Sequence, residues 1–330
     1  MNAADPVPEP ASGDDGLRDL TRFRAEVMYA VASQYYLEDV TQAHIAERLG
    51  VSRATVSRML TEARMRGIVE ISVHRPAGTD NEQLAAEVAE ALRLQQVFIV
   101  PKVAGPQLGP WLAPGVSRAL SMVGLESGDT VLVSSGRTVY ECALEERTRL
   151  PGVVIAPAVG GQEEPQPWFQ TNETTRILAE RTGARPSYLY APALPGRELF
   201  ASLQRDPSFQ RVKNLWAQAR CAVVGVGSAP LTRQSLPAFV PADAPSLRRA
   251  VGDVCSRFYD RDGEPVSYPG SERLVATSLE DLQRVPVTIA VAVGEEKIVS
   301  IVAGARGRYF NQLVTDVSTA SALLEVTRRP

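Results

Sequence analysis

The sequence predicts an α/β protein with two domains: a small helical domain with a wing at the amino end, and a larger domain around an open, mostly parallel sheet. Three observations predict this fold class. The 330 residues are 44% hydrophobic, which is enough apolar material for a large core. Apolar side chains recur at helical spacing between residues 17 and 67. Beyond residue 81, short apolar runs alternate with helical stretches, which is typical of parallel strands covered on both faces.

Residues 1–16 are expected to form a disordered tail. They carry four acidic side chains and three prolines, unlike the basic and apolar start of a signal peptide. No apolar run is long enough to cross a bilayer, and the three cysteines (Cys142, Cys221 and Cys255) are odd in number and lack the spacing of metal ligands. We therefore expect a cytoplasmic protein with core thiols, no bound metal and no contact with a membrane.

The segment from Leu17 to Glu38 is predicted to be one long amphipathic helix, because its large apolar residues stand three and four positions apart. This helix would support the elements that follow it. Its N-terminal part could instead pair with a second copy of the chain.

The stretch TQAHIAERLGVSRATVSRMLTEARMRG, residues 41–67, reads as two short helices joined by a tight turn. Gly50 suits a left-handed backbone at the end of the first helix, where a residue with a Cβ would be strained. Ser52 can accept from the first N–H groups of the second helix as its N-cap. With its apolar residues turned inward, the second helix must present polar side chains outward.

These outward side chains suit a DNA groove. Arginine forks bind guanine or phosphate, hydroxyls bind either, and small methyl-bearing residues fit against thymine. Between Thr41 and Arg75 there are six arginines and three glutamates, so the segment is basic within a chain of net charge −3. The alternative is a helical hairpin with a merely solvated charged face. The residues expected to contact DNA are Thr41, Gln42, Ser52, Arg53, Ala54, Thr55, Ser57, Arg58 and Arg64.

A short strand is predicted after the helix pair, because IVEISVHR, residues 68–75, alternates apolar and polar side chains. It would form a small wing and complete a winged helix-turn-helix domain over residues 17–75. The turn-rich sequence that follows is interpreted as a linker over residues 76–81. The second domain then occupies residues 82–330.

The second domain is predicted to alternate strands and helices. Strands are expected at 97–100, 130–134, 153–159, 188–191, 221–227, 288–293 and 312–317, and helices at 81–94, 114–123, from 137, 171–182, from 295 and 318–327. Ligands of such sheets bind beyond the carboxyl ends of the strands, so the loops that follow the strands are the places to search for a site.

Four of these loops are rich in glycine, hydroxyl or charged residues, namely residues 134–138, 160–163, 225–228 and 294–297. Glycine and hydroxyl residues before a helix leave several backbone N–H groups free, which is what a phosphate or a set of sugar hydroxyls requires. Each loop alone could be an ordinary strand-to-helix turn, but four at one edge favour a binding site. The expected effector-binding residues are Ser134, Ser135, Gly136, Arg137, Thr138, Gly160, Gly161, Gln162, Glu163, Gly227, Asp253 and Lys297.

Lys297 and Asp253 are the charged members of this expected site. Only Lys102, Lys213 and Lys297 are lysines among 35 basic residues, so Lys297 is a candidate phosphate contact. Its alternative role is that of a solvated lysine in the first turn of a helix. Asp253 or Glu163 could accept hydrogen bonds from sugar hydroxyls, although Asp253 could equally cap a turn.

In order and spacing, the motifs resemble the SorC-type family of bacterial transcriptional regulators from about Arg24 to Leu324. The resemblance rests on YYLEDVTQAHIAERLGVSRATVSRML, GIVEI, SSGRT, VVIAPAVGG, the GVG of AVVGVGSAP, GDVCSRFYDRDG, IAVAVGEEK and LVTDVSTASALL. It implies a winged helix-turn-helix, a Rossmann-like effector domain similar to sugar-phosphate isomerases and deaminases, and a tetramer built from dimers. It also implies that a sugar or phosphosugar controls the hold on operator DNA.

The chain departs from the pattern of this family at four positions near the expected pocket. Family members commonly have Trp or another bulky residue at the position of Ser135, Gly at Ser256, a second Gly at Val293 and an acidic residue at Val317. These departures concern the class of ligand rather than the fold.

The sequence therefore predicts a transcriptional regulator whose partners are double-stranded operator DNA, a sugar or phosphosugar and further copies of the chain, with RNA polymerase as another candidate partner. The alternative is a sugar-phosphate isomerase or deaminase with an appended DNA-binding domain. Both histidines, His44 and His74, lie in the first domain, so the second domain has no imidazole for acid–base chemistry. A DNA-binding structural protein without a ligand would leave the Gly-rich loops unexplained. No cofactor is expected beyond the effector.

Overall fold

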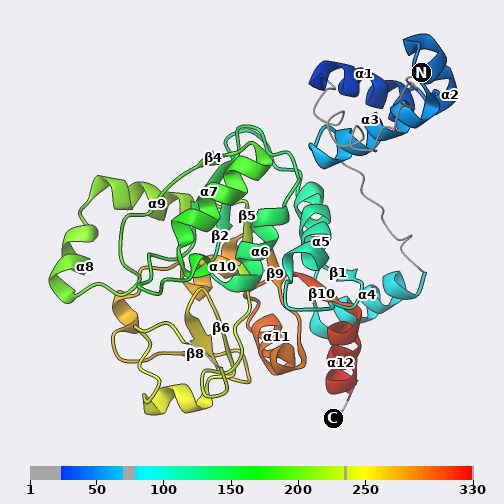
Figure 1. The fold of residues 1–330 in the computed structure, drawn as a ribbon. Coiled ribbons are helices and arrows are strands. Elements are labelled where there is room, and N and C mark those ends of the chain that lie inside the picture. The colour runs from blue at the N-terminus through cyan, green and yellow to red at the C-terminus, as the bar shows by residue number, and fades with distance from the viewer. Residues whose placement is uncertain (1–23, 70–78, 234–235, 329–330) are drawn as a thin grey trace, which may run out of the picture. The chain divides into compact units, whose positions relative to one another are not determined.

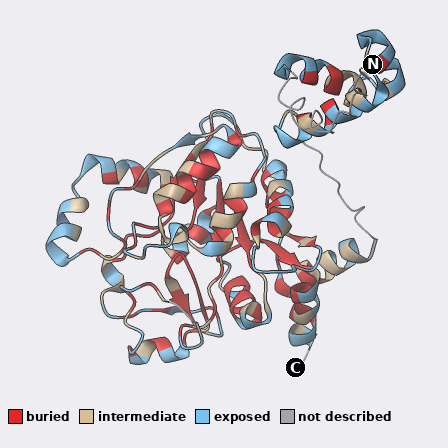
Figure 2. Cartoon of the chain, in the orientation of Figure 1, coloured by how far each residue is buried: buried red, intermediate tan, exposed pale blue. Residues whose placement is uncertain are grey.

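The computed structural model describes residues 24–69, 79–233 and 236–328 (Figure 1). The chain divides into two compact units, residues 1–76 and 77–330. Each unit has its own apolar core, and the buried residues in Figure 2 lie mainly on the sheet and on the inner faces of the helices.

The first unit packs three helices around one core: α1 (Ala25–Tyr36), α2 (Gln42–Leu49) and α3 (Arg53–Met65). Every turn of these helices sends at least one apolar side chain inward, as the helical spacing predicts. The buried members are Met28, Val31, Ala32, Ile45, Ala46, Val56, Met59, Leu60 and Ala63.

The turn between α2 and α3 has the geometry that the sequence predicts. Gly50 ends α2 with a φ of 65°, in the left-handed region that favours glycine. The Ser52 Oγ accepts from the backbone N–H of Thr55 at 3.1 Å and caps α3. The Thr41 Oγ1 caps α2 in the same way, with the N–H of His44 at 3.4 Å. The predicted helix-turn-helix is confirmed.

The first predicted helix and the wing are only partly within the described residues. The helix expected over 17–38 ends at Tyr36, two residues early, and its first seven residues lie outside the described part. Of the predicted wing strand, Ile68 and Val69 pack at the edge of the core, whereas residues 70–75 lie outside the described part.

The second unit is built on a seven-stranded sheet in which every pairing is parallel, so the predicted open, mostly parallel sheet is confirmed. Across the sheet the order is β1 (Gln96–Val100), β10 (Gln312–Asp316), β9 (Val287–Val291), β5 (Cys221–Gly225), β2 (Thr130–Val133), β3 (Val154–Pro157) and β4 (Arg185–Pro186).

Helices cover both faces of this sheet. Successive residues of a strand point to opposite faces, so Ala222 and Val224 of β5 join one apolar cluster while Cys221 and Val223 join the other. The first cluster packs against α4 (Thr79–Leu92), α9 (Pro207–Ala217), α11 (Ile298–Arg306) and α12 (Val317–Arg328). The second packs against α5 (Gly109–Met122), α6 (Arg137–Glu145) and α7 (Thr171–Thr182).

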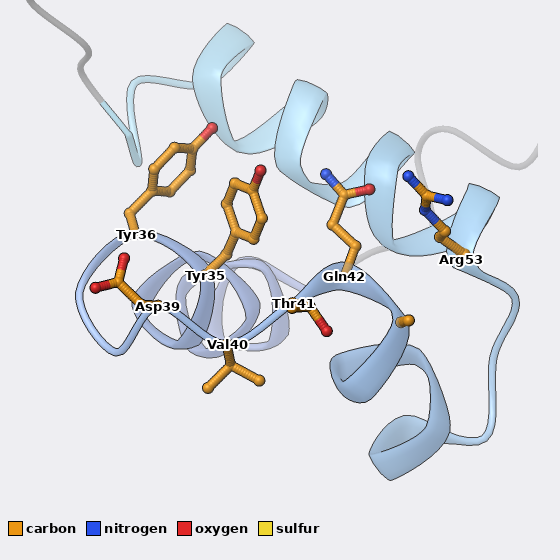
Figure 3. Close-up of a pocket in the computed structure, with 8 residues that line it drawn as sticks. Tyr35, Tyr36, Asp39, Val40, Thr41, Gln42 and Arg53 are labelled. Carbon is orange, nitrogen blue, oxygen red and sulfur yellow. The ribbon is translucent and has the colours of Figure 1, made fainter.

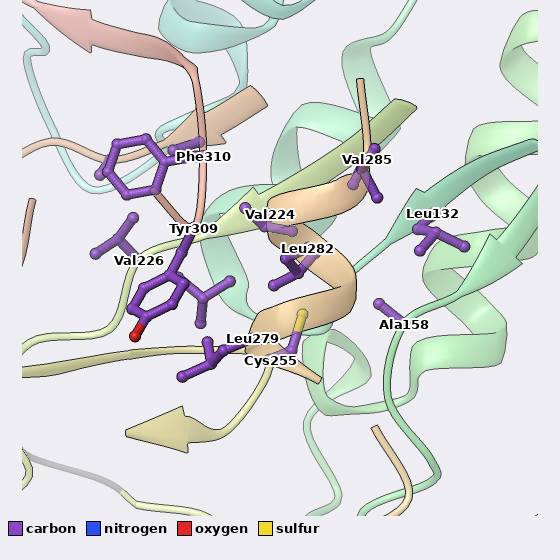
Figure 4. Packing of buried hydrophobic residues seen from close by; sticks show 14 of the residues in the cluster. Leu132, Ala158, Val224, Val226, Cys255, Leu279, Leu282, Val285, Tyr309 and Phe310 are labelled. Atoms are coloured by element: carbon purple, nitrogen blue, oxygen red, sulfur yellow. The ribbon is translucent and has the colours of Figure 1, made fainter. Parts of the chain in front are cut away.

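A second, antiparallel sheet follows β5 in the chain and was not predicted as such. It contains β6 (Gly252–Val254), β7 (Arg257–Tyr259) and β8 (Pro265–Val266), and α10 (Leu279–Arg284) follows it. Figure 4 shows Leu279 and Leu282 of α10 in the same apolar cluster as Leu132 of β2 and Val224 of β5. Val254 of β6 and Tyr259 of β7 belong to the same cluster, so the second sheet, which carries Asp253, packs against the main one.

Two other predictions about this unit were wrong, and two helices were missed. The strand expected at 188–191 does not form, and β4 lies before it at Arg185–Pro186. The segment between residues 191 and 221 holds α9 and the short helix α8 (Arg197–Leu203), which were not predicted. The linker expected over 76–81 ends sooner, because α4 begins at Thr79.

The remaining short elements are the 3-10 turns η1 (Pro167–Phe169), η2 (Pro245–Arg249), η3 (Ser271–Arg273) and η4 (Glu295–Lys297). The three cysteines are free and buried, which confirms that they are core thiols. Burial raises the pKa of Cys221 to about 12. Across residues 24–69, 79–233 and 236–328, no helix has the length and hydropathy to cross a membrane. The same residues contain no cluster of three His, Cys, Asp or Glu side chains fit to hold a metal ion.

Candidate DNA interface and effector site

The outward face of α3 carries the basic side chains that the sequence assigned to DNA. Arg53, Ala54, Ser57 and Arg58 are exposed in its first two turns. Recognition helices usually contact base edges with these turns. Arg64 is exposed farther along, and its guanidinium donates to the hydroxyl of Thr61 at 3.3 Å.

Ser52 and Thr55 are also on this face but are engaged with each other. Their hydroxyl oxygens are 2.8 Å apart, and the Ser52 Oγ also accepts from the backbone of Thr55. Both hydroxyls therefore stabilise the start of α3 in the absence of DNA, which is a structural role that the sequence assigned only to Ser52.

Thr41, Gln42 and Arg53 line one hollow of about 590 Å³ in the first unit (Figure 3). The rings of Tyr35 and Tyr36 form its other wall, in an edge-to-face pair with centroids 4.9 Å apart. Both tyrosines were predicted only as apolar positions of the first helix. Phenol hydroxyls can bind phosphate oxygens, so Tyr35 and Tyr36 enlarge the polar surface next to α3.

The four Gly-rich and charged loops follow four neighbouring strands, β9, β5, β2 and β3, whose carboxyl ends share one edge of the sheet. The chain leaves β2 toward β3 and leaves β5 toward β9, which are opposite directions along the sheet. Strands β2 and β5 therefore flank a switch point, where ligands of open α/β sheets bind.

Ser134 holds the two sides of this switch point together. Its hydroxyl accepts from the N–H of Gly225 at 3.1 Å and donates to the carbonyl of Ser135 at 3.0 Å, and the residue is only 1% exposed. Ser134 therefore positions the loops. Gly136 follows with φ 120° and ψ 147°, a conformation open in practice only to glycine, and it begins α6. The first helical bond runs from the N–H of Tyr140 to the carbonyl of Gly136, so the N–H groups of Arg137 and Thr138 precede it.

Lys297 lies in η4, the turn that follows the carboxyl end of β9. Its Nζ donates to the carbonyl of Val226 at 2.7 Å, so it is a held and largely buried side chain rather than a solvated one. Burial and, secondly, the positive charge of Arg233 lower the pKa of Lys297, whereas Asp253 and Glu296 act in the opposite direction. A cation kept here at a cost in solvation favours an anionic partner.

Asp253 stands beside Lys297 and takes one of the two roles that the sequence left open, that of capping a turn. Its Oδ2 accepts from the N–H of Ser256 at 3.1 Å and caps the turn of the β6–β7 hairpin. Its Oδ1 accepts from Arg233, which the sequence analysis did not single out. Arg233 also donates to the carbonyl of Ser228 at 2.7 Å. The loop after β5 therefore brings a second cation to the site.

Gln162 and Ser135 lie on the loops after β3 and β2, on the other side of the switch point from Lys297. The side-chain amide of Gln162 donates to the Ser135 hydroxyl at 2.9 Å, which joins the loops after β3 and β2. The N–H of Gly136 donates to the carbonyl of Trp168 at 2.8 Å, so Trp168 lies next to the start of α6.

The comparisons with known proteins agree with this architecture. The model of a sugar-binding domain (Sugar-bind) matches residues 78–325, and that of a Crp-like helix-turn-helix domain matches residues 25–86. The chain is 31% identical to the sorbitol operon regulator of Klebsiella pneumoniae over 305 residues, which cover 89% of this chain and 96% of the relative. The chain belongs to the SorC-type family of sugar-responsive transcriptional regulators.

Other relatives share the same organisation. The deoxyribonucleoside regulator of Bacillus subtilis is 31% identical over 323 residues, covering 92% of this chain and 99% of the relative. The crystal structure of full-length SorC from Klebsiella pneumoniae matches with a TM-score of 0.75 and 29% identity, over 92% of this chain and 99% of that one. This SorC-type protein is accordingly a DNA-binding regulator with a sugar-binding domain and not an enzyme.

Several residues that the sequence assigned to the effector site of this SorC-type regulator are committed elsewhere. Gly160 and Gly161 donate their N–H groups to the carbonyls of Val275 and Ala191, at 2.8 Å each. A Cβ on Gly160 would meet backbone atoms at 2.8 to 2.9 Å, so that glycine permits close packing of two segments. Glu163 is exposed.

Gly227 and Arg137 were also expected to bind the effector, and they too are bonded to other parts of the protein. Gly227 donates its N–H to the carbonyl of Asp253 at 2.9 Å. Arg137 projects its guanidinium to Glu141 at 2.7 Å and to the carbonyl of Pro106, and it stands 5.9 Å from the centre of the Trp168 ring. Its side chain therefore lies on α6 and on the loop before α5.

Proposed function

We propose that the effector of this regulator is a phosphorylated sugar, bound at the carboxyl ends of β2, β5 and β9. The observation that carries the proposal is the charge of the site, where Arg233 is paired with Asp253 and the Nζ of Lys297 is bonded to the carbonyl of Val226 rather than to a carboxylate. An added dianion would compensate the buried positive charge, whereas a neutral sugar would not.

The start of α6 supplies the second half of the phosphate site. The N–H groups of Arg137 and Thr138 precede the first helical bond, and the positive end of the helix dipole lies there. Ser135, Thr138, Gln162 and Asp253 are then available for sugar hydroxyls or phosphate oxygens. No cofactor is needed for this binding.

The effector would act by binding one conformational state better than the other, since only a difference in affinity can move the DNA equilibrium. A single helix-turn-helix reads few base pairs, so we further propose that the protein is a dimer at least, and a tetramer in its full form, on two-fold-related half-sites. RNA polymerase remains a proposed partner of the DNA-bound form.

The experiment is a melting-shift screen with matched pairs, each free sugar against its phosphate: glucose and glucose 6-phosphate, fructose and fructose 6-phosphate, ribose and ribose 5-phosphate, and sorbitol and sorbitol 6-phosphate. Each compound is then added to the protein on DNA from its own promoter region, and fluorescence anisotropy reports retention. We expect at least one phosphate, and not its free sugar, to raise the melting temperature and change operator affinity. Stabilisation by a free sugar alone would overturn the phosphosugar proposal.

A further inference from the structure

The segment that joins β1 to α5, residues 101–109, is tied to the effector site at two separate points. We call it the strap. At its first tie, the N–H of Val103 donates to the Oδ2 of Asp316 at 3.1 Å. The Oδ1 of Asp316 accepts from the backbone N–H of Thr319 at 2.9 Å. The hydroxyl of Thr319 in turn accepts from the N–H of Gly294 at 3.0 Å. Gly294 begins the turn that carries Lys297.

The second tie runs through α6. The Oε2 of Glu141 accepts from the N–H groups of Leu108, at 2.5 Å, and Gly109, at 3.2 Å, where α5 begins. Its Oε1 accepts from Arg137 at 2.7 Å, and Arg137 also donates to the carbonyl of Pro106. A Cβ on Gly109 would collide with the backbone of Glu141, so α5 and α6 approach closely here. The strap is thus bonded to both halves of the cradle proposed for the phosphosugar.

Arg137 has two competing uses. It is the first residue of α6, whose N–H groups are proposed to hold the phosphate, yet its guanidinium is bound to a carboxylate and a carbonyl. Its side chain is 49% exposed whereas that of Glu141 is 16% exposed, so Arg137 is the partner that is free to turn. A guanidinium binds phosphate through the same two-pronged geometry as carboxylate.

We propose that Arg137 is a switch residue, which Glu141 and Pro106 hold when the site is empty and which the phosphate of the effector draws away when it is filled. This inference rests on the proposed function. It adds the route by which binding of the effector changes the contacts of the strap. With Arg137 drawn away, the strap loses its bond at Pro106 but keeps the ones at Val103, Leu108 and Gly109.

The strap is well placed to pass this change on. It follows β1 directly, and β1 follows α4, which is the first element of the second unit after the segment that joins the two units. The rival interpretation is that Glu141 only caps α5 and Arg137 only neutralises Glu141. In that case the pair would not respond to an anion at the start of α6.

A double-mutant cycle separates the two interpretations, with inorganic phosphate as the probe. The variants are E141Q, which keeps a hydrogen-bond acceptor but loses the charge that holds Arg137, R137A, and the two combined. The matched control is E145Q, since Glu145 is an exposed carboxylate on the same helix. K297M reports whether the phosphate is in the proposed site. Circular dichroism and melting curves confirm that each variant is folded.

We expect E141Q to bind inorganic phosphate about fivefold more tightly than the parent protein, a gain in the usual range of couplings between sites. The gain should vanish in E141Q/R137A and be absent in E145Q. In the parent, phosphate should speed amide hydrogen exchange in residues 103–108. Phosphate binding that depends on Lys297 but does not tighten in E141Q would overturn the switch, as would a gain that survives R137A. Phosphate binding that ignores K297M would instead overturn the proposed function.

Discussion

Arg233 and Asp253 form an ion pair over Gly227, although 20 residues separate the two charged side chains in the chain. The side chains are 19% and 12% exposed, so the pair is largely withdrawn from water. A Cβ at Gly227 would collide with the Asp253 carboxylate and the Arg233 guanidinium. The glycine therefore leaves the space in which the two charges meet.

Gly227→Ala should separate Arg233 from Asp253. The effector concentration needed for a given melting shift should then rise at least tenfold. Both displaced groups are ends of side chains and can move, so the cost in free energy of unfolding should stay near 1 kcal/mol. Urea unfolding and the melting-shift titration measure the two quantities. Gly196→Ala is the control, because nothing lies within 4 Å of a Cβ there and its φ of −61° is ordinary. An unchanged titration for Gly227→Ala would remove this pair from the site.

The two-residue turn of the β6–β7 hairpin is strained in a way that a substitution can relieve. Cys255 and Ser256 have φ angles of 52° and 60°, as a type I′ turn requires, and Val254 pairs with Arg257 on either side. A residue with a Cβ loses about 1–2 kcal/mol in this region, part of which glycine recovers. Ser256→Gly should raise the free energy of unfolding by about 0.5 kcal/mol, measured with urea. Ser256→Ala keeps the strain and should give no gain, so equal effects of the two would contradict the explanation.

The sequence predicts the parallel sheet well because its signals are local. A buried parallel strand is a short apolar run. β2, β5 and β10 lie within the expected ranges, and β9 begins one residue before the range expected for it. The apolar run at 188–191 is the instructive exception. The side-chain amide of Asn172 bonds both the N–H and the carbonyl of Leu189, at 3.0 Å each, in the way that a neighbouring strand would. Asn172 thus takes the place of a neighbouring strand for the backbone of Leu189, and only the folded structure shows this contact.

The signals for α9 are present in the sequence, because Phe209, Val212 and Trp216 stand three and four positions apart and all three are buried. Asp206 caps the helix and Pro207 occupies its first turn, a pairing that marks a helix start. Its Trp216 then anchors it by donating to the carbonyl of Pro157 at 2.8 Å. A search for caps would have found this helix where a search for apolar runs did not.

The candidate site was harder to predict, since its decisive contacts are long-range. The loops after β2, β3, β5 and β9 could be assigned to one edge because strands of a parallel sheet point the same way. The pairing of Asp253 with Arg233 could not be predicted, because nothing in the sequence around Arg233 marks it as a partner. Arg137 shows the converse, since its place in the SSGRT motif favours the site whereas its side chain is bound by Glu141.

Arg53→Ala and Arg58→Ala should each weaken operator binding about tenfold without changing the melting temperature. Both side chains are exposed on the first two turns of α3, so neither supports the core. An arginine bound to phosphate should also reduce the slope of log affinity against log salt by about one, whereas one bound to a base edge should change sequence preference instead. Anisotropy titrations at several salt concentrations measure both. Arg181→Ala, exposed on α7, is the control. Parent-like affinity in both variants would contradict the proposed orientation of α3.

The buried ammonium of Lys297 should make the stability of the protein depend on pH in a specific direction. Its pKa is lowered in the folded state, first by burial and next by Arg233. Between the folded and unfolded pKa values the unfolded chain binds more protons, so this group contributes stability that rises with pH and is lost as the pH falls through the folded value. Lys297→Met removes this contribution, so the difference in free energy of unfolding between variant and parent should shrink as the pH rises toward the usual lysine pKa of about 10.4.

The same shift can be observed directly, because the chain has only three lysines, Lys102, Lys213 and Lys297. Protein labelled with ¹³C-lysine should give three Cε signals, and the one that is missing in Lys297→Met should titrate below the usual lysine pKa of about 10.4. Arg233→Gln removes a neighbouring positive charge, so the pKa of Lys297 should rise toward its usual value. Lys213→Met serves as the assignment control. A Lys297 signal that titrates at the usual lysine pKa, or that ignores Arg233→Gln, would show that Lys297 and Arg233 do not share the site, and the case for an anionic effector would lose its main support.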